Sequence, residues 1–176
     1  SDMLYENMMN KFQWGGLDTH PEKIYMDENN RRFVMNLKSS FLSLAEQLVK
    51  EKKNKKAEEV LDKCFSLFSS EQAPYNYYDL LLADLYYQID KAEKGKEVLK
   101  TAADLFQEEA IYYLSLEDEH LAGITDDVGR LALIYEETFK MFFAEGESEL
   151  ANEYAMLIFD KIEERFGFGI TLSQLG

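Results

Sequence analysis

The chain has few of the residues that build catalytic or metal sites. Its 176 residues include one cysteine and two histidines. A single cysteine, Cys64, excludes an internal disulfide, and its place in an apolar helical pattern is explained by packing. His20 and His120 lie far apart in the chain, without a metal-ligand spacing or a convincing Ser-His-Asp order. We therefore expect no catalytic residue, no metal site and no cofactor.

Helix breakers and long apolar runs are also scarce. The chain has two prolines and nine glycines, a composition that favours long, uninterrupted helices. No apolar run approaches the roughly 20 residues that a membrane-spanning helix needs. The densest apolar stretch, residues 80–87, is short and contains Asp84. With 46% hydrophobic and 30% charged residues, the chain is predicted to fold as one globular domain.

Basic residues are few in the second half of the chain. The net charge is −15, of which residues 101–176 carry −13, with 17 acidic and 4 basic residues. An acidic surface of this strength repels phosphate backbones, so we expect no nucleic-acid partner. Two interpretations of the acidic half stay open: a solvated face that aids solubility, or a docking surface for a basic partner.

Apolar periodicity predicts an all-α fold in a single helical-repeat domain, 1–176. An N-terminal helix and loop occupy 1–26, with a break at Trp14. Asp27 is the expected N-cap of the next helix, and Asn54 is expected to take the left-handed conformation in the turn that follows it. The helical hairpins and the tail are expected at 27–70, 75–114, 126–166 and 167–176.

The most informative pattern is a helix-pair motif that occurs twice at one fixed offset. Each position of the second copy follows its match in the first copy by the same number of residues, which is the interval from Phe41 to Asp79. A fixed period of this length is typical of stacked helical hairpins, and such stacks usually bind partners. The two copies read Phe41, Leu44, Ala45, Leu48, Ala57, Leu61, Cys64 and Asp79, Leu82, Ala83, Tyr86, Gly95, Leu99, Ala102.

These positions resemble the tetratricopeptide repeat, a helix pair with small residues where the helices cross. Ala45 and Ala83 match the small residue of the first helix, and Ala57, Gly95 and Ala151 match that of the second. A small side chain lets two helix axes approach closely. The tryptophan position of the family is occupied by Phe41 and Asp79, and Ala151 follows Gly95 at a longer interval than Gly95 follows Ala57. A generic helical bundle is the alternative.

A second resemblance covers residues 5–165. Four blocks, 6–16, 25–32, 57–64 and 112–116, are similar to the C-terminal tail of a family of large Bacteroidetes membrane proteins. The membrane part of that family is similar to protein O-mannosyltransferases. The resemblance implies that this chain is a soluble appendage, tethered through an upstream membrane region and lying on the extracytoplasmic, periplasmic side. It implies no catalysis in this fragment.

One helix is rich in tyrosine and carries the candidate binding site. In the geometry of the repeat, Tyr77, Asp84 and Tyr87 would line a groove, with Glu46 and Ser39 of the first hairpin beside them. Tyrosine offers a flat apolar face with a polar tip, which suits contacts with peptides or sugars. The alternative is that these tyrosines belong to the core.

The preferred hypothesis is a non-catalytic protein-interaction module that binds a protein or peptide segment. The first alternative is a glycan-handling accessory domain of a glycosyltransferase-like membrane protein. The second is a free-standing repeat scaffold with no membrane tether.

Overall fold

The computed structural model describes residues 1–20, 24–25, 27–70 and 73–166, and all its regular structure there is helical. The expected tail, 167–176, lies outside the described residues. The chain divides into two compact units, Ser1–Val98 (unit 1) and Leu99–Gly176 (unit 2), and the boundary falls inside helix α5 (Ala92–Ser115). Helical hairpins are confirmed as the building blocks of the fold. Among the described residues, no helix is long and apolar enough to cross a membrane.

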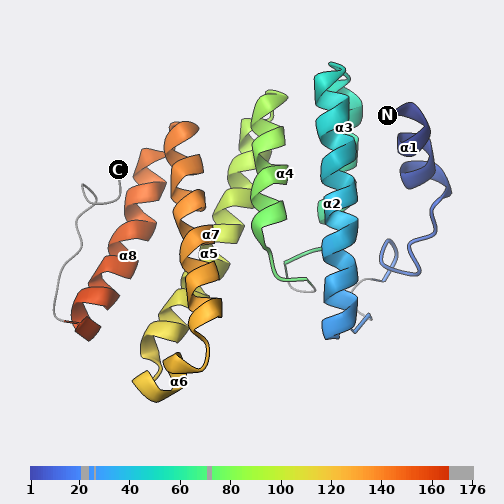
Figure 1. Cartoon of the computed structure of the whole chain (residues 1–176). Helices are drawn as coiled ribbons and strands as arrows, with labels where there is room; N and C mark the ends of the chain where they lie inside the picture. Colours follow the sequence, from blue (N-terminus) through green and yellow to red (C-terminus); the bar gives the residue numbers. More distant parts are fainter. Residues whose placement is uncertain (21–23, 26, 71–72, 167–176) are drawn as a thin grey trace. The chain divides into compact units, whose positions relative to one another are not determined.

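Unit 1 is built on the hairpin of α2 (Glu28–Lys50) and α3 (Asn54–Leu67), which pack side by side (Figure 1). α4 (Tyr77–Gln88) packs against α2. As expected, Asp27 caps α2: its carboxylate accepts a hydrogen bond from the backbone N–H of Asn30 at 2.8 Å. α4 begins with a capping box in which Asn76 and Asp79 bond each other's backbone N–H groups.

The N-terminal segment forms α1 (Asp2–Glu6) and continues as a π-helix, η1 (Asn7–Lys11). Lys53 and Lys56 of the hairpin form ion pairs with Asp2, and the hydroxyl of Tyr5 donates a hydrogen bond to Glu59. These contacts hold α1 close to the start of α3.

The expected break after this segment brings Trp14 into the core. Gly15 and Gly16 both have positive φ angles, which glycine adopts without the strain of a side chain. The indole of Trp14 stacks on Phe41 at 5.4 Å and meets Phe68 edge-on at 6.4 Å. The turn therefore adds an aromatic residue to the α2–α3 core.

The three hairpins turn in the same way. Lys52, Asp90 and Gly146 have positive φ angles, and the residue after each donates its backbone N–H to a carbonyl five positions earlier. This is the Schellman closure of a helix C-terminus. The offset between the first two turns equals that of the sequence repeat, and the offset between the second and third equals the longer one from Gly95 to Ala151. The expectation that Asn54 is left-handed was wrong: Lys52 takes that conformation, and Asn54 starts α3.

Unit 2 contains the second part of α5, the short α6 (Asp118–Ala122), α7 (Thr125–Ala144) and α8 (Ser148–Phe166). α6 lies between the expected second and third hairpins, 75–114 and 126–166. α7 and α8 pack together, and the ring of Phe142 stacks on Tyr154 at 5.8 Å. The Tyr154 hydroxyl donates a hydrogen bond to Asp104 of α5. Arg165 of α8 forms an ion pair with Asp118 at 2.8 Å.

Candidate functional site

The predicted site residues lie on two neighbouring helices of unit 1. Ser39 and Glu46 belong to α2, whereas Tyr77, Asp84 and Tyr87 belong to α4. Because α2 packs directly against α4, the structure brings the two sets onto adjacent elements.

Tyr77 is the first residue of α4, and 46% of its surface is exposed. The capping box of Asn76 and Asp79 fixes the backbone at this point. Further along α4, Tyr86 is almost completely buried. The hydroxyl of Tyr86 donates a hydrogen bond to Asp62 at 2.7 Å. Tyr77 therefore differs from the core tyrosine of its own helix by presenting much of its ring to solvent.

A stripe of α4 continues from Tyr77 through Leu81 to Asp84, at spacings of four and three residues. Residues at these spacings share one side of a helix. Leu81 and Asp84 are half-buried, and the Asp84 carboxylate accepts a hydrogen bond from the Gln88 side chain at 2.6 Å. The stripe offers an aromatic ring, an aliphatic side chain and a carboxylate in sequence.

The matching stripe of α2 is polar. Ser39 and Glu46 are half-buried, and Ser43 between them is exposed. The Ser43 hydroxyl donates a hydrogen bond to the Ser39 carbonyl at 3.0 Å, and Glu46 lies 4.0 Å from the Lys50 ammonium. We call the two stripes together the α2–α4 face: Ser39, Ser43 and Glu46 of α2 with Tyr77, Leu81 and Asp84 of α4.

Tyr87 was predicted to line the same groove, but its ring lies where α4 crosses α5. A Cβ added to Gly95 would come within 2.5 Å of the Tyr87 ring and 3.1 Å of the Ala83 carbonyl oxygen. Tyr87 is half-buried. The ring thus packs closely on the backbone of Gly95, and we leave it out of the α2–α4 face.

A buried ion pair that was not predicted from the sequence joins α2 to α4. The Lys38 ammonium of α2 lies 2.7 Å from an Asp79 carboxylate oxygen of α4, and both side chains are fully buried. The other Asp79 oxygen accepts a hydrogen bond from the Asn76 backbone N–H at 2.8 Å. The Lys38 ammonium also lies 5.0 Å from the centre of the Tyr75 ring. α2 and α4 are thus joined by a charge contact shielded from water.

The surroundings of the pair have two opposing effects on the pKa of Asp79. Burial raises the pKa of the Asp79 carboxyl above its ordinary value, while Lys38 and the cap hydrogen bond oppose this shift. A signal for the pair was present in the sequence. Lys38 lies on the apolar stripe that contains Val34, Phe41 and Ala45, and Asp79 holds the repeat position equivalent to Phe41. Ionisable residues at two core positions of neighbouring helices predict such a pairing.

The residues considered for chemistry are dispersed. Burial raises the pKa of the Cys64 thiol, which disfavours the reactive thiolate. His20 and His120 are both exposed. Within the described ranges, no group of three or more histidine, cysteine, aspartate or glutamate side chains is placed to hold a metal ion.

A shallow depression of about 170 Å³ lies between residues 14–17 with Ile24 and the first half of α2. None of the predicted site residues lines it. The side chains around it are mainly apolar: Trp14, Leu17, Ile24, Phe33, Val34 and Leu37, with Asn30 and the backbone of Gly15.

Comparisons with known proteins found no relative of this chain. No protein-family model matches the chain, and neither the curated proteins nor the solved structures contain a significant match.

Proposed function

We propose that unit 1 is a non-catalytic protein-interaction module, and that the α2–α4 face binds a peptide segment of a partner protein. The observation that carries this proposal is the exposure of Tyr77 at 46%, at the end of a stripe with Leu81 and Asp84. Tyrosine is enriched at protein interfaces because its ring provides apolar area and its hydroxyl a hydrogen bond.

The buried ion pair between α2 and α4 supports the same proposal. A binding surface is more effective when its elements are held in place before the partner arrives, because less ordering is needed on association. The contact of Lys38 with Asp79 joins the two helices that carry the face. The capping box that contains Asp79 also fixes the backbone at Tyr77.

The test is selection of peptides from a displayed random library on the immobilised chain, followed by affinity measurements on variants. We expect Tyr77→Ala and Asp84→Lys each to weaken the selected peptides about tenfold, the size of an interface hot-spot loss. Tyr112→Ala is the matched control, because Tyr112 is an exposed tyrosine of α5 outside the face. Peptides that bind both tyrosine variants equally well would overturn the proposal. A glycan array that gives Tyr77-dependent binding, without peptide binding, would favour the glycan-handling alternative.

We further propose that the module is tethered to a membrane through sequence upstream of Ser1, on the extracytoplasmic side. The support is the resemblance of four sequence blocks to tails of Bacteroidetes membrane proteins. Reading the full gene upstream of Ser1 tests this. Several apolar runs of about 20 residues would agree with a tether. An open reading frame that begins at Met3 would contradict it and favour a free-standing scaffold.

A further inference from the structure

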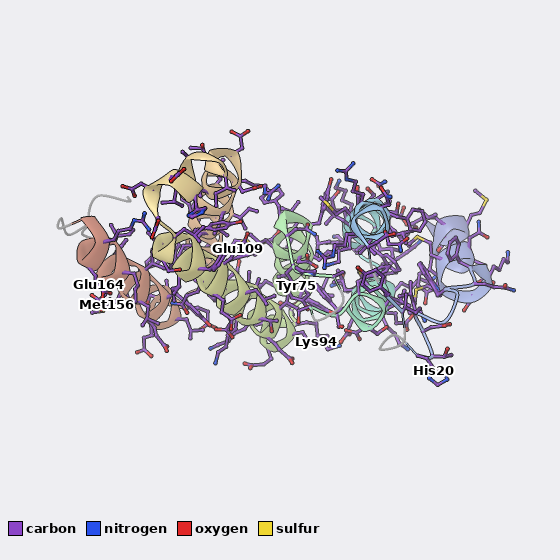
Figure 2. The ribbon with its side chains drawn as sticks, turned by 90° about the horizontal axis from the view of Figure 1, so that it is seen from below. His20, Tyr75, Lys94, Glu109, Met156 and Glu164 are labelled. Carbon is purple, nitrogen blue, oxygen red and sulfur yellow. The ribbon has the colours of Figure 1, made fainter. Side chains whose placement is uncertain are left out.

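The surface of α8 that points away from the core of unit 2 carries a continuous acidic stripe. Glu149, Glu153, Met156 and Asp160 follow one another at spacings of four, three and four residues, and all four are exposed. The opposite side of α8 is buried through Ala151, Ala155 and Ile158. Figure 2 labels Met156 and Glu164 on this outer side of the helix.

Among the described residues of unit 2, ion pairs do not balance the acidic charge of the stripe. Each basic residue after position 100 is already engaged by an acidic neighbour, at 2.7 or 2.8 Å: Arg130 by Asp127, Lys140 by Glu136 and Glu137, Lys161 by Glu164 and Arg165 by Asp118. Among the described residues, no ion pair involves Glu149, Glu153 or Asp160. Asp160 also interacts electrostatically with the adjacent Lys161, whose ion pair is with Glu164, and the stripe remains a negative surface on a strongly acidic unit.

Apolar side chains interrupt the carboxylates. Met156 is 60% exposed and its neighbour Leu157 is 48% exposed. Single exposed apolar residues are common on protein surfaces, but here two adjacent ones lie between carboxylates on one side of the helix, so the stripe combines apolar area with negative charge. Methionine is flexible and polarisable, and is common on surfaces that accept helices of varied sequence.

We propose that the α8 face, defined as Glu149, Glu153, Met156, Leu157 and Asp160, docks a basic amphipathic helix of a partner protein. The apolar side of that helix covers Met156 and Leu157, while its lysines or arginines pair with the flanking carboxylates. Charge complementarity selects a cationic partner and rejects nucleic acid, whose phosphates the acidic unit repels. This surface belongs to unit 2 and is separate from the α2–α4 face of unit 1.

The first experiment measures how tightly the full chain binds a fluorescent synthetic peptide. The peptide is an amphipathic helix in which leucines form one side and lysines the other, on a 3.6-residue period. We expect binding that weakens as salt is raised, because exposed charges are screened. A scrambled peptide of the same composition has the same charge without an apolar side. Equal binding of the two peptides would overturn the proposal, since it would show attraction by charge alone.

The second experiment locates the site with charge-matched variants. Glu153→Lys combined with Asp160→Lys should weaken the amphipathic peptide at least about tenfold. The control combines Glu108→Lys with Asp126→Lys, which changes the net charge equally at exposed positions of α5 and α7. The control should lose less than about threefold. An equal loss of affinity in both variants would show that the peptide responds to the net charge of the protein, which would contradict a site on α8.

The third variant, Met156→Ser, leaves the charge unchanged and tests the apolar part of the face. We expect several-fold weaker binding, with far-UV circular dichroism and Tm unchanged because Met156 is exposed. Unchanged affinity would remove Met156 from the site and overturn the proposed contact. Salt-sensitive self-association in sedimentation velocity, without peptide binding, would instead make a second copy of the chain the occupant.

Discussion

The Lys38 ammonium and the Asp79 carboxylate lie 2.7 Å apart, and both side chains are excluded from water. They lie far apart in the chain and join α2 to α4. A buried ion pair is costly to form, because both charges lose their hydration, and very costly to break on one side only. We therefore expect unit 1 to be strongly destabilised by the loss of either partner alone.

Lys38→Met leaves Asp79 buried without its cation and should lower the free energy of unfolding by about 3–5 kcal/mol. The double variant Lys38→Met/Asp79→Leu removes both charges and should recover most of that loss. It should still lack about 1 kcal/mol for the lost cap contact with the Asn76 backbone. Urea denaturation followed by circular dichroism measures all three proteins. A single variant as stable as the parent would show that the contact contributes little.

Gly95→Ala should destabilise unit 1, although alanine is the better helix former. The new methyl group would lie 3.1 Å from the Ala83 carbonyl oxygen, a backbone atom that cannot turn aside, and closer still to the Tyr87 ring. Overpacking of this kind costs about 1–3 kcal/mol, against a gain of about 1 kcal/mol in helix propensity.

Gly129→Ala provides the matched control for this substitution. Gly129 lies inside α7, and an added Cβ there would meet no atom within 4 Å. It should therefore raise the free energy of unfolding by about 0.5–1 kcal/mol. Thermal unfolding of the two variants should show shifts of Tm in opposite directions. A rise of Tm in both would contradict the close approach of α4 and α5.

The turn at Lys52 should tolerate glycine better than lysine. Its φ angle of 57° is left-handed, and a residue with a Cβ loses about 1 kcal/mol there. Lys52→Gly should raise Tm slightly, whereas Glu108→Gly in the middle of α5 should lower stability by about 1 kcal/mol. A lower Tm for Lys52→Gly would mean that the Lys52 side chain stabilises the turn by another contact.

The docking of α1 should depend on pH in the acid range. Hydrogen bonds from Lys53 and Lys56 lower the pKa of Asp2 from 3.8 to about 2, and Lys53 together with Ser1 and Gln47 lowers that of Glu51 to about 2. Because the folded pKa lies below the unfolded value, these contacts stabilise α1 above about pH 4 and are lost as the pH falls toward 2. NMR titration of the two carboxyl groups measures this.

The variant Lys53→Met tests the cause of these pKa shifts. Lys53 contacts both carboxylates, Asp2 at 2.6 Å and Glu51 at 2.7 Å. Its removal should therefore raise both pKa midpoints part of the way toward their ordinary values, because Asp2 keeps Lys56 while Glu51 keeps Ser1 and Gln47. Midpoints that stay near 2 in this variant would show that another group lowers them.

The sequence predicted the helices well, because the 3.6-residue apolar period depends on local geometry that each segment contributes itself. It also predicted Asp27 as the N-cap of α2. The sequence did not predict features that depend on the contact between two separate segments. The left-handed position fell on Lys52 instead of Asn54, since the last turn of α2 determines where its Schellman bonds close. The packing of Tyr87 on Gly95 and the pairing of Lys38 with Asp79 depend on how separate helices cross, which no local period reports.

Because the turns at Lys52 and Asp90 have the same backbone geometry, the segment 53–90 is a unit that could be duplicated. An inserted copy of this segment would begin and end at the same backbone geometry, so the chain could be extended without designing a new turn. The buried pair limits such growth. The repeat offset that carries Lys52 to Asp90 carries Lys38 to Asn76, so a copied Asp79 would meet no lysine in the preceding helix. Lengthening of the array therefore requires an apolar residue at the copied Asp79, or a new cation opposite it.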